Sequence, residues 1–121
     1  MINIFKVDEK EINEYRNIFK INNNSDIYLF RLDNKTIGYG LLDINNKENT
    51  IYISISNSHR GNGYGKELFK YILNEIKTIG IKKLELKIPK NNIYARNIIS
   101  SIGGVHLSST ENNDLYSIPI K

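Results

Sequence analysis

The sequence predicts a fold of helices and strands (α/β in the broad sense, with an α+β mixed sheet). Its helices pack on the sheet, and the element order is β-α-β-β-β-α-β-α-β-β. Several short segments alternate apolar and polar residues, as half-buried strands do. Other, longer segments repeat apolar residues every three or four positions, as one face of a helix does. A length of 121 residues suits one hydrophobic core, so we expect a single domain over residues 1–121.

The first half of the chain predicts one helix among four strands. Asp8, followed three residues later by Glu11, has the pattern of a capping box at a helix start. Ile12, Tyr15 and Phe19 then fall on one helical face. The predicted strands cover residues 2–7, 27–32, 36–44 and 50–57, with asparagine-rich or polar turns at 22–25, 33–35 and 45–49.

The second half predicts two helices and three strands. A glycine-rich segment, residues 60–66, follows the strand at 50–57 and opens a helix that Gly80 closes as a C-cap. A second helix is expected over residues 91–102, closed by Gly103 and Gly104. The apolar stripe of the first of these helices consists of Leu68, Phe69, Ile72, Leu73 and Ile76. The remaining strands are expected at residues 81–88, 105–107 and 115–118.

The composition argues against several kinds of site and partner. The chain has no cysteine, which excludes disulfides, thiolate metal sites and a cysteine nucleophile, and its two histidines disfavour any metal centre. The net charge of +4 comes without a long basic tract, and the aromatic residues form no stacking platform for nucleic acid. No apolar run has membrane-spanning length, and the first residues lack a signal-peptide pattern. We therefore expect a cytoplasmic protein without a membrane or nucleic-acid partner.

The glycine-rich segment at 60–66 is the strongest functional signal. Gly61, Gly63 and Gly65 allow a sharp turn and a close backbone approach to a ligand, just where a helix offers its free N–H groups. Such a site suits phosphate, although glycines in a strand-to-helix turn can also be purely structural. The segment is not a Walker A motif, because Lys66 is followed by Glu67, and its G-x-G-x-G spacing differs from the Rossmann fingerprint.

The run Arg60-x-x-Gly63-x-Gly65 resembles the acetyl-CoA signature of the GCN5-related N-acetyltransferase (GNAT) family. A second run, with Asn92, Ala95 and Gly103, resembles the family's N-x-x-A…G pattern at the start of the following helix. Order and spacing match from about residue 26 to the end of the sequence. The resemblance implies a sheet whose central strands splay apart, with acetyl-CoA as acyl donor.

The resemblance also implies roles for particular residues. Backbone groups of the strand before the loop would pair with the pantetheine arm like an added strand, and loop amides would bind the diphosphate. Lys66 would contact phosphate or solvent, and Asn92 would bind pantetheine or cap its helix. A backbone N–H near Ile55 would polarise the thioester during direct transfer to a primary amine. The implied cofactor-binding residues are Ile53, Ser54, Ile55, Arg60, Gly61, Asn62, Gly63, Tyr64, Gly65, Lys66 and Asn92.

The chain departs from the family pattern at the expected general acid. A tyrosine often lies seven residues after the asparagine, but here that position is Ile99, which cannot donate a proton. Tyr94 and Ser100 are substitute candidates and Glu85 is a candidate base, and each also has an ordinary structural interpretation. The alternative function is therefore a CoA-binding module that has lost catalysis and acts as a sensor or partner-binding domain.

The acceptor side is also unusual. About eighteen residues separate the first two strands, enough for one helix where the family usually has two. We expect an open acceptor groove, suited to a bulky or peptide-like amine or to a homodimer partner that completes the wall. Tyr39, Tyr52 and Tyr116 are candidates to line it, or are ordinary strand aromatics.

Overall fold

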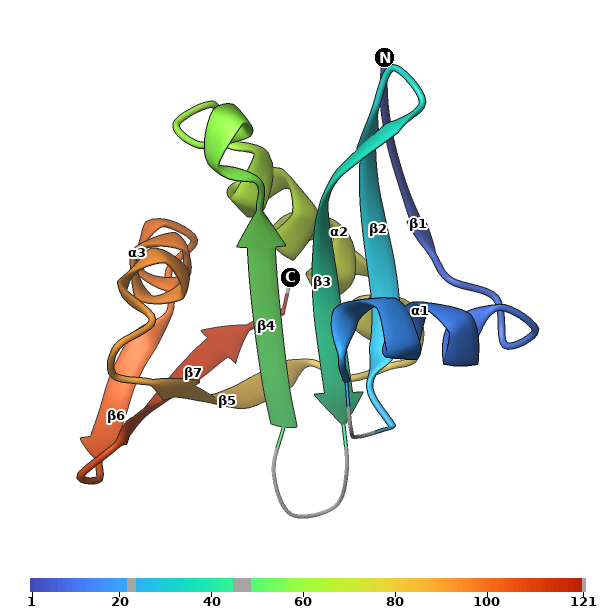
Figure 1. Cartoon of the computed structure of the whole chain (residues 1–121). Helices are drawn as coiled ribbons and strands as arrows, with labels where there is room; N and C mark the ends of the chain where they lie inside the picture. Colours follow the sequence, from blue (N-terminus) through green and yellow to red (C-terminus); the bar gives the residue numbers. More distant parts are fainter. Residues whose placement is uncertain (22–23, 45–48, 121) are drawn as a thin grey trace.

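A computed structural model describes residues 1–21, 24–44 and 49–120, and the element order in it confirms the prediction (Figure 1). Three helices and seven strands lie within these residues, together with a single 3₁₀ turn at Asn57–His59. The strands are β1 (Ile2–Lys6), β2 (Asp26–Leu32), β3 (Lys35–Ile44), β4 (Asn49–Ile55), β5 (Lys83–Pro89), β6 (Val105–Ser109) and β7 (Asn113–Pro119). The helices are α1 (Ile12–Phe19), α2 (Tyr64–Thr78) and α3 (Ile93–Ser101).

The strands form two antiparallel sheets instead of one continuous mixed sheet. One has the order β1-β2-β3-β4 and the other the order β5-β7-β6. No ladder joins β4 to β5 in the described residues, and Figure 1 shows these two strands running in clearly different directions. The predicted splaying of the central strands is thus confirmed. Because β4 lacks a strand partner on this side, its outer backbone groups are not used by a sheet ladder.

The four-stranded sheet has a helix on each face. On one face, Leu68, Phe69 and Ile72 of α2 are fully buried against the isoleucines of β4. Gly40 of β3 makes this contact close, since an added Cβ would lie 2.7 Å from the Cδ1 atom of Ile72. Each large apolar side chain buried in this way contributes about 1.5–3 kcal/mol of burial free energy.

The other face carries α1, the only helix between β1 and β2 within the described residues. Val7, Ile27 and Leu29 are buried there, with Tyr15 and Phe19 of α1 packed against them. The prediction of a shortened N-terminal helical region is therefore confirmed. In β4, side chains alternate between the two faces, so Tyr52 and Ser54 lie on the α1 side of the sheet.

Some local predictions differ from the structure. Helix α1 begins at Ile12, and Asp8 accepts a hydrogen bond from the Lys10 N–H (3.2 Å), so Asp8 makes a turn where a capping box was predicted. The β2–β3 turn has the two positive φ angles of a tight hairpin, 51° at Asp33 and 68° at Asn34. Residues 45–48 of the predicted turn and residues 22 and 23 of the predicted break lie outside the described residues. In the described part of the chain, no helix is both long and apolar enough to cross a bilayer.

Candidate functional site

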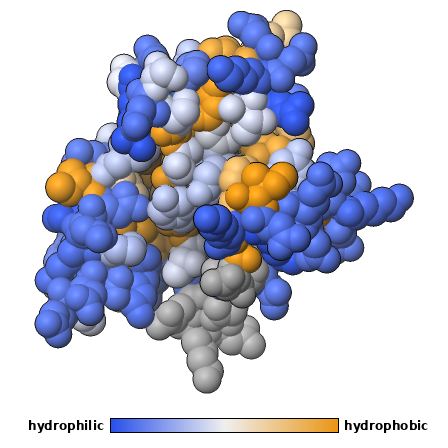
Figure 2. Space-filling view, in the orientation of Figure 1, coloured by the Kyte–Doolittle hydropathy of each residue, from blue (hydrophilic) through white to orange (hydrophobic). Residues whose placement is uncertain are grey.

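A cleft of about 340 Å³ lies where β4 and β5 separate. It is bounded by β4 on one side and by the end of β5 and the start of α3 on the other. Figure 2 views this side of the molecule, where pale and hydrophobic residues gather between more hydrophilic surfaces. The residues lining the cleft are Tyr52, Ile53, Ser54, Ile55, Arg60, Pro89, Asn91, Asn92 and Tyr94.

In β4, the backbone N–H and C=O groups of every second residue point toward this cleft. The Ser56 N–H donates to the Ile37 carbonyl (2.8 Å), which makes this a hydrogen-bonded pair of the β3–β4 ladder. Because such pairs alternate along an antiparallel ladder, the backbone groups of Ser54 pair with β3. Those of Ile53 and Ile55 point the other way, into the cleft. The guanidinium Nε of Arg60 already donates to one of them, the Ile55 carbonyl (3.0 Å).

The glycine-rich segment leads from this strand into α2. Gly61 and Gly63 have φ angles of 84° and 77°, which favour glycine, and an added Cβ at either would meet no atom within 4 Å. Gly63 is the N-cap residue of α2 and has no side chain to cap it. The first intrahelical bond runs from the Glu67 N–H to the Gly63 carbonyl (3.1 Å), so the N–H groups that precede Glu67 have no partner within the helix. The positive end of the α2 dipole therefore lies open beside the cleft.

Gly65 serves a different purpose from the two other glycines. It is buried in the first turn of α2, and an added Cβ would lie only 1.8 Å from the hydroxyl oxygen of Tyr94. Tyr94 comes from α3, so this contact joins two helices at one end of the cleft. Burial raises the pKa of the Tyr94 hydroxyl, and the Gly65 backbone and the Arg60 guanidinium lower it in part. The phenol is therefore protonated at neutral pH.

Asn92 both lines the cleft and caps α3. Its side-chain oxygen accepts a hydrogen bond from the Ala95 N–H (3.1 Å), as an N-cap residue does. Of the two predicted roles, the capping role is therefore present in the structure. Asn62 lies in the glycine-rich segment, where its side chain donates to the His59 carbonyl (3.2 Å).

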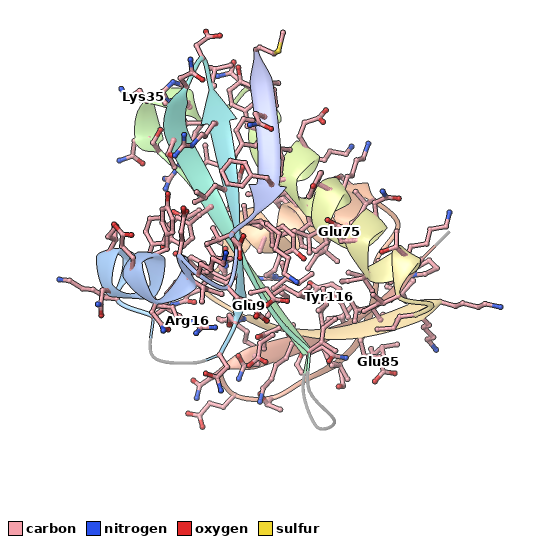
Figure 3. The ribbon with its side chains drawn as sticks, turned by 90° about the vertical axis from the view of Figure 1, so that its right-hand side faces the viewer. Glu9, Arg16, Lys35, Glu75, Glu85 and Tyr116 are labelled. Atoms are coloured by element: carbon pink, nitrogen blue, oxygen red, sulfur yellow. The ribbon has the colours of Figure 1, made fainter. Side chains whose placement is uncertain are left out.

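None of residues 61–66 is part of the cleft lining, and neither are the catalytic candidates Ser100 and Glu85. Tyr64 packs against Phe30, with ring centroids 5.1 Å apart, and Lys66 is half-buried in the first turn of α2. Ser100 is exposed on α3, and Glu85 is exposed on β5 (Figure 3). Ile99 is fully buried in the core, so the position of the usual tyrosine holds an apolar side chain.

The three tyrosines proposed for the acceptor side are not all together. The rings of Phe19 and Tyr39 stack with their centroids 4.1 Å apart. The centroid of the Tyr39 ring lies 6.1 Å from that of Tyr52, which lines the cleft. Tyr116 lies on β7 in the other sheet, where its hydroxyl accepts a hydrogen bond from Arg96 of α3 (3.4 Å). The stacking of Phe19 on Tyr39 escaped sequence reasoning, because no sequence pattern relates a helix residue to a strand twenty positions later.

A buried carboxylate supports α3 from β7. The Asp114 side chain is only 5% exposed and accepts a hydrogen bond from the Ser109 hydroxyl (2.6 Å). Arg96 of α3 and His106 of β6 lie 3.5 and 3.3 Å from its oxygens. The Ser109 hydrogen bond, followed by His106 and Arg96, lowers the pKa of this carboxyl group. No group of three side chains suited to a metal ion was found among the described residues.

A comparison with protein families identifies the family of this chain. The family model described as the acetyltransferase (GNAT) family matches residues 3–103, which include the glycine-rich segment and the Asn92–Gly103 run. No curated protein sequence matches the chain.

Solved structures share the fold at low sequence identity. The ribosomal-protein-S18-alanine N-acetyltransferase from Escherichia coli is 14% identical, with a TM-score of 0.74 over 100% of this chain and 95% of that one. The yncA protein from Salmonella typhimurium, whose structure holds its cofactor acetyl-CoA, is 11% identical with a TM-score of 0.75 and the same coverage. A domain from Methanocaldococcus jannaschii is 18% identical, with a TM-score of 0.74 over 98% of each chain. Because the family model spans most of its length, the chain belongs to the acetyltransferase (GNAT) family, whose members use acetyl-CoA.

Proposed function

We propose that this protein transfers an acetyl group from acetyl-CoA directly to a primary amine, with both substrates bound together. One observation carries the proposal: the cleft lies between two strands that do not pair with each other, and Tyr94 of its lining contacts Gly65 in the first turn of α2. A long donor with an amide-rich arm and a diphosphate matches both parts of this feature.

The glycine end of the cleft fits a diphosphate. The N–H groups at the start of α2, which have no partner within the helix, and the guanidinium of Arg60 present positive charge to the same region. Gly61 and Gly63 leave open space there, since a Cβ on either would meet nothing. Each charge-assisted hydrogen bond formed by these groups is worth about 1.5–3 kcal/mol before desolvation is subtracted.

The strand end of the cleft fits the pantetheine arm. The outer backbone groups of Ile53 can pair with its amides as a neighbouring strand would, and the Ile55 carbonyl, which already accepts from the Arg60 Nε, has a second lone pair for one of them. Ser54 contributes its side chain here, because its backbone pairs with β3. Asn92, already fixed as a cap, has its amide nitrogen left over for a hydrogen bond to the arm.

The chemistry requires little from side chains. When bound, acetyl-CoA supplies a thioester whose acyl carbon an unprotonated amine can attack. The Ile55 N–H points into the cleft, where it can polarise a carbonyl oxygen, and the two walls hold the reactants in proximity. The chain has no cysteine, which agrees with direct transfer. A thiol with a pKa of about 8.5 leaves tolerably well near neutral pH, so the apolar Ile99 lowers the rate without preventing the reaction.

The amine is expected to enter along the α1 side of β4. Tyr52 is exposed there at the edge of the cleft, and Tyr39 and Phe19 continue the aromatic surface toward α1. Rings in this position can hold an ammonium or an apolar stem before transfer. In the part of the chain that the structure describes, α1 is the only helix between β1 and β2, so we expect an open acceptor side that suits a bulky amine, a peptide or a second copy of the chain.

Buried Ile99 favours one alternative, a CoA-binding module without catalysis. Glu85 and Ser100 also lie outside the cleft lining, so no proton donor or base replaces the usual tyrosine from those positions.

Calorimetry and thiol release separate the two functions. We expect acetyl-CoA to bind with a Kd of about 100 μM or tighter. We also expect thiol release above the rate without enzyme when small amines, lysine peptides or peptide N-termini are added. Absence of binding would overturn both functions, whereas binding without amine-dependent thiol release would support the non-catalytic module.

A further inference from the structure

Tyr94 lies where α2 and α3 meet at the glycine end of the cleft. Its hydroxyl oxygen is 1.8 Å from the position that a Cβ of residue 65 would take, and its ring carbon Cζ is 2.5 Å from it. The hydroxyl therefore fills the space that the missing side chain of Gly65 leaves in the first turn of α2. Position 65 has to be glycine for this tyrosine to reach the start of the helix.

The surroundings make this hydroxyl a donor. Tyr94 lines the cleft together with Arg60, and the guanidinium is close enough to influence its titration. Burial raises the pKa of the phenol, which keeps its proton in place at neutral pH. The hydroxyl thus adds an O–H group to the N–H groups at the start of α2 that have no partner within the helix, near the positive end of the helix dipole.

We propose that Tyr94 is an anion-binding residue that donates its hydroxyl proton to the diphosphate of CoA from the α3 side of the cleft. This inference rests on the proposed function, because it assumes that the diphosphate binds at the start of α2. It assigns Tyr94 a binding role instead of the general-acid role for which it was a candidate. Gly65 acts through Tyr94, as a positioning residue.

The first test is CoA binding by calorimetry. Tyr94→Phe keeps the ring but removes the donor, so CoA affinity is expected to fall about tenfold, as loss of one hydrogen bond to a charged group does. Tyr71→Phe is the matched control, because Tyr71 lies on α2 outside the cleft lining and its variant is expected to bind CoA like the wild type. Equal affinity of Tyr94→Phe and wild type would overturn the inference but leave the proposed function intact. If the wild type itself binds no CoA, both fail.

The second test separates diphosphate binding from proton transfer. S-acetylpantetheine has the thioester but no diphosphate, so Tyr94→Phe should reduce kcat/KM for acetyl-CoA and leave kcat/KM for S-acetylpantetheine unchanged. A loss of equal size with both donors would place the hydroxyl at the thioester and overturn the inference.

The third test uses the contact with Gly65. Gly65→Ala places a methyl group where the hydroxyl lies, so it should displace the tyrosine and weaken CoA binding. In a Tyr94→Ala background the same change should cost no further affinity and should raise the Tm, because alanine favours a helix over glycine. If Gly65→Ala weakens CoA binding equally in both backgrounds, the glycine acts independently of Tyr94 and the positioning role is wrong.

Discussion

The two ends of the cleft are built from different parts of the chain. At the glycine end, the groups that face a ligand are mainly backbone N–H groups, set by two positive φ angles and by the start of α2. At the acceptor end, the surface consists of side chains, with exposed Tyr52 continuing into Tyr39 and Phe19. A site made of backbone tolerates many side chains around it but few changes of conformation. A site made of side chains tolerates changes of backbone conformation better but depends on residue identity. Substitutions can therefore change which acceptor binds while the donor stays the same.

The comparison is tested most severely at Gly63. Gly63→Asp places a carboxylate at the N-cap of α2, next to the expected phosphates. Like charges about 4 Å apart near a protein surface repel by about 4 kcal/mol, so CoA affinity is expected to fall about a hundredfold or more. Calorimetry measures the affinity, and circular dichroism checks that the fold is retained.

Gly63→Asn is the matched control for this change. Asparagine has nearly the same shape and tolerates a φ of 77° as aspartate does, but carries no charge. The asparagine variant should therefore keep much more affinity than the aspartate variant. Equal losses would mean that shape, and not the charge of a phosphate, decides binding at this end.

At the acceptor end, truncation of Tyr52 should change the amine and not the donor. Tyr52→Ala removes an exposed ring at the edge of the cleft, so KM for the amine is expected to rise about tenfold, the cost of one aromatic contact. Tyr52→Phe keeps the ring and should stay near the wild type. Initial-rate kinetics at varied amine, with CoA binding measured in parallel, distinguish the two substrates; a change confined to CoA affinity would contradict the acceptor assignment.

This difference also explains what the sequence could predict. Gly61 and Gly63 are visible in sequence because their backbone conformation favours one residue type, and strand alternation revealed the element order. The purpose of Gly65 was not visible, since it depends on Tyr94, which reaches it from another helix. Residue spacing encodes local backbone geometry, whereas contacts between distant elements depend on how those elements pack.

The acceptor side shows the same limit. Tyr39, Tyr52 and Tyr116 were equivalent in sequence, as aromatic residues in strands. The β3–β4 ladder brings the first two together, while Tyr116 faces Arg96 of α3. The failed capping box at Asp8 is a local counterpart, because an aspartate can satisfy a turn as readily as a helix end.

A smaller effect is expected at Asn92, whose side chain caps the backbone of α3 and also lines the cleft. Asn92→Ala removes the cap on the Ala95 N–H and should lower the free energy of unfolding by about 1 kcal/mol in urea denaturation. Asn92→Asp keeps an oxygen for the cap and should restore most of this stability. If the aspartate variant still binds CoA more weakly, the amide nitrogen has a second role toward pantetheine; if both variants bind CoA normally, Asn92 is a cap alone.

The smallest effect concerns pH and the support of α3. Asp114 has a lowered pKa in the folded protein, chiefly because the Ser109 hydroxyl donates to it. A carboxyl group whose folded pKa is depressed stabilises the fold above its unfolded pKa of about 3.9, and this contribution disappears as pH falls toward the folded value. Thermal unfolding should therefore show a higher Tm for the wild type than for Asp114→Asn near pH 7. The difference should shrink below about pH 4.

Ser109→Ala tests whether the Ser109 hydrogen bond is the main cause of the lowered pKa of Asp114. It removes the largest cause of the shift but leaves Arg96 and His106 beside the carboxylate, so its pH dependence should lie between those of the wild type and Asp114→Asn. Arg96 also donates to the Lys90 carbonyl (3.3 Å), one residue before the cleft wall at Asn91. If Arg96 is held less firmly, the cleft wall at Asn91 should loosen before the glycine end does. We therefore expect the Tm to fall clearly while CoA affinity changes little. A Tm difference independent of pH would mean that the Asp114 charge contributes nothing to holding α3 in place.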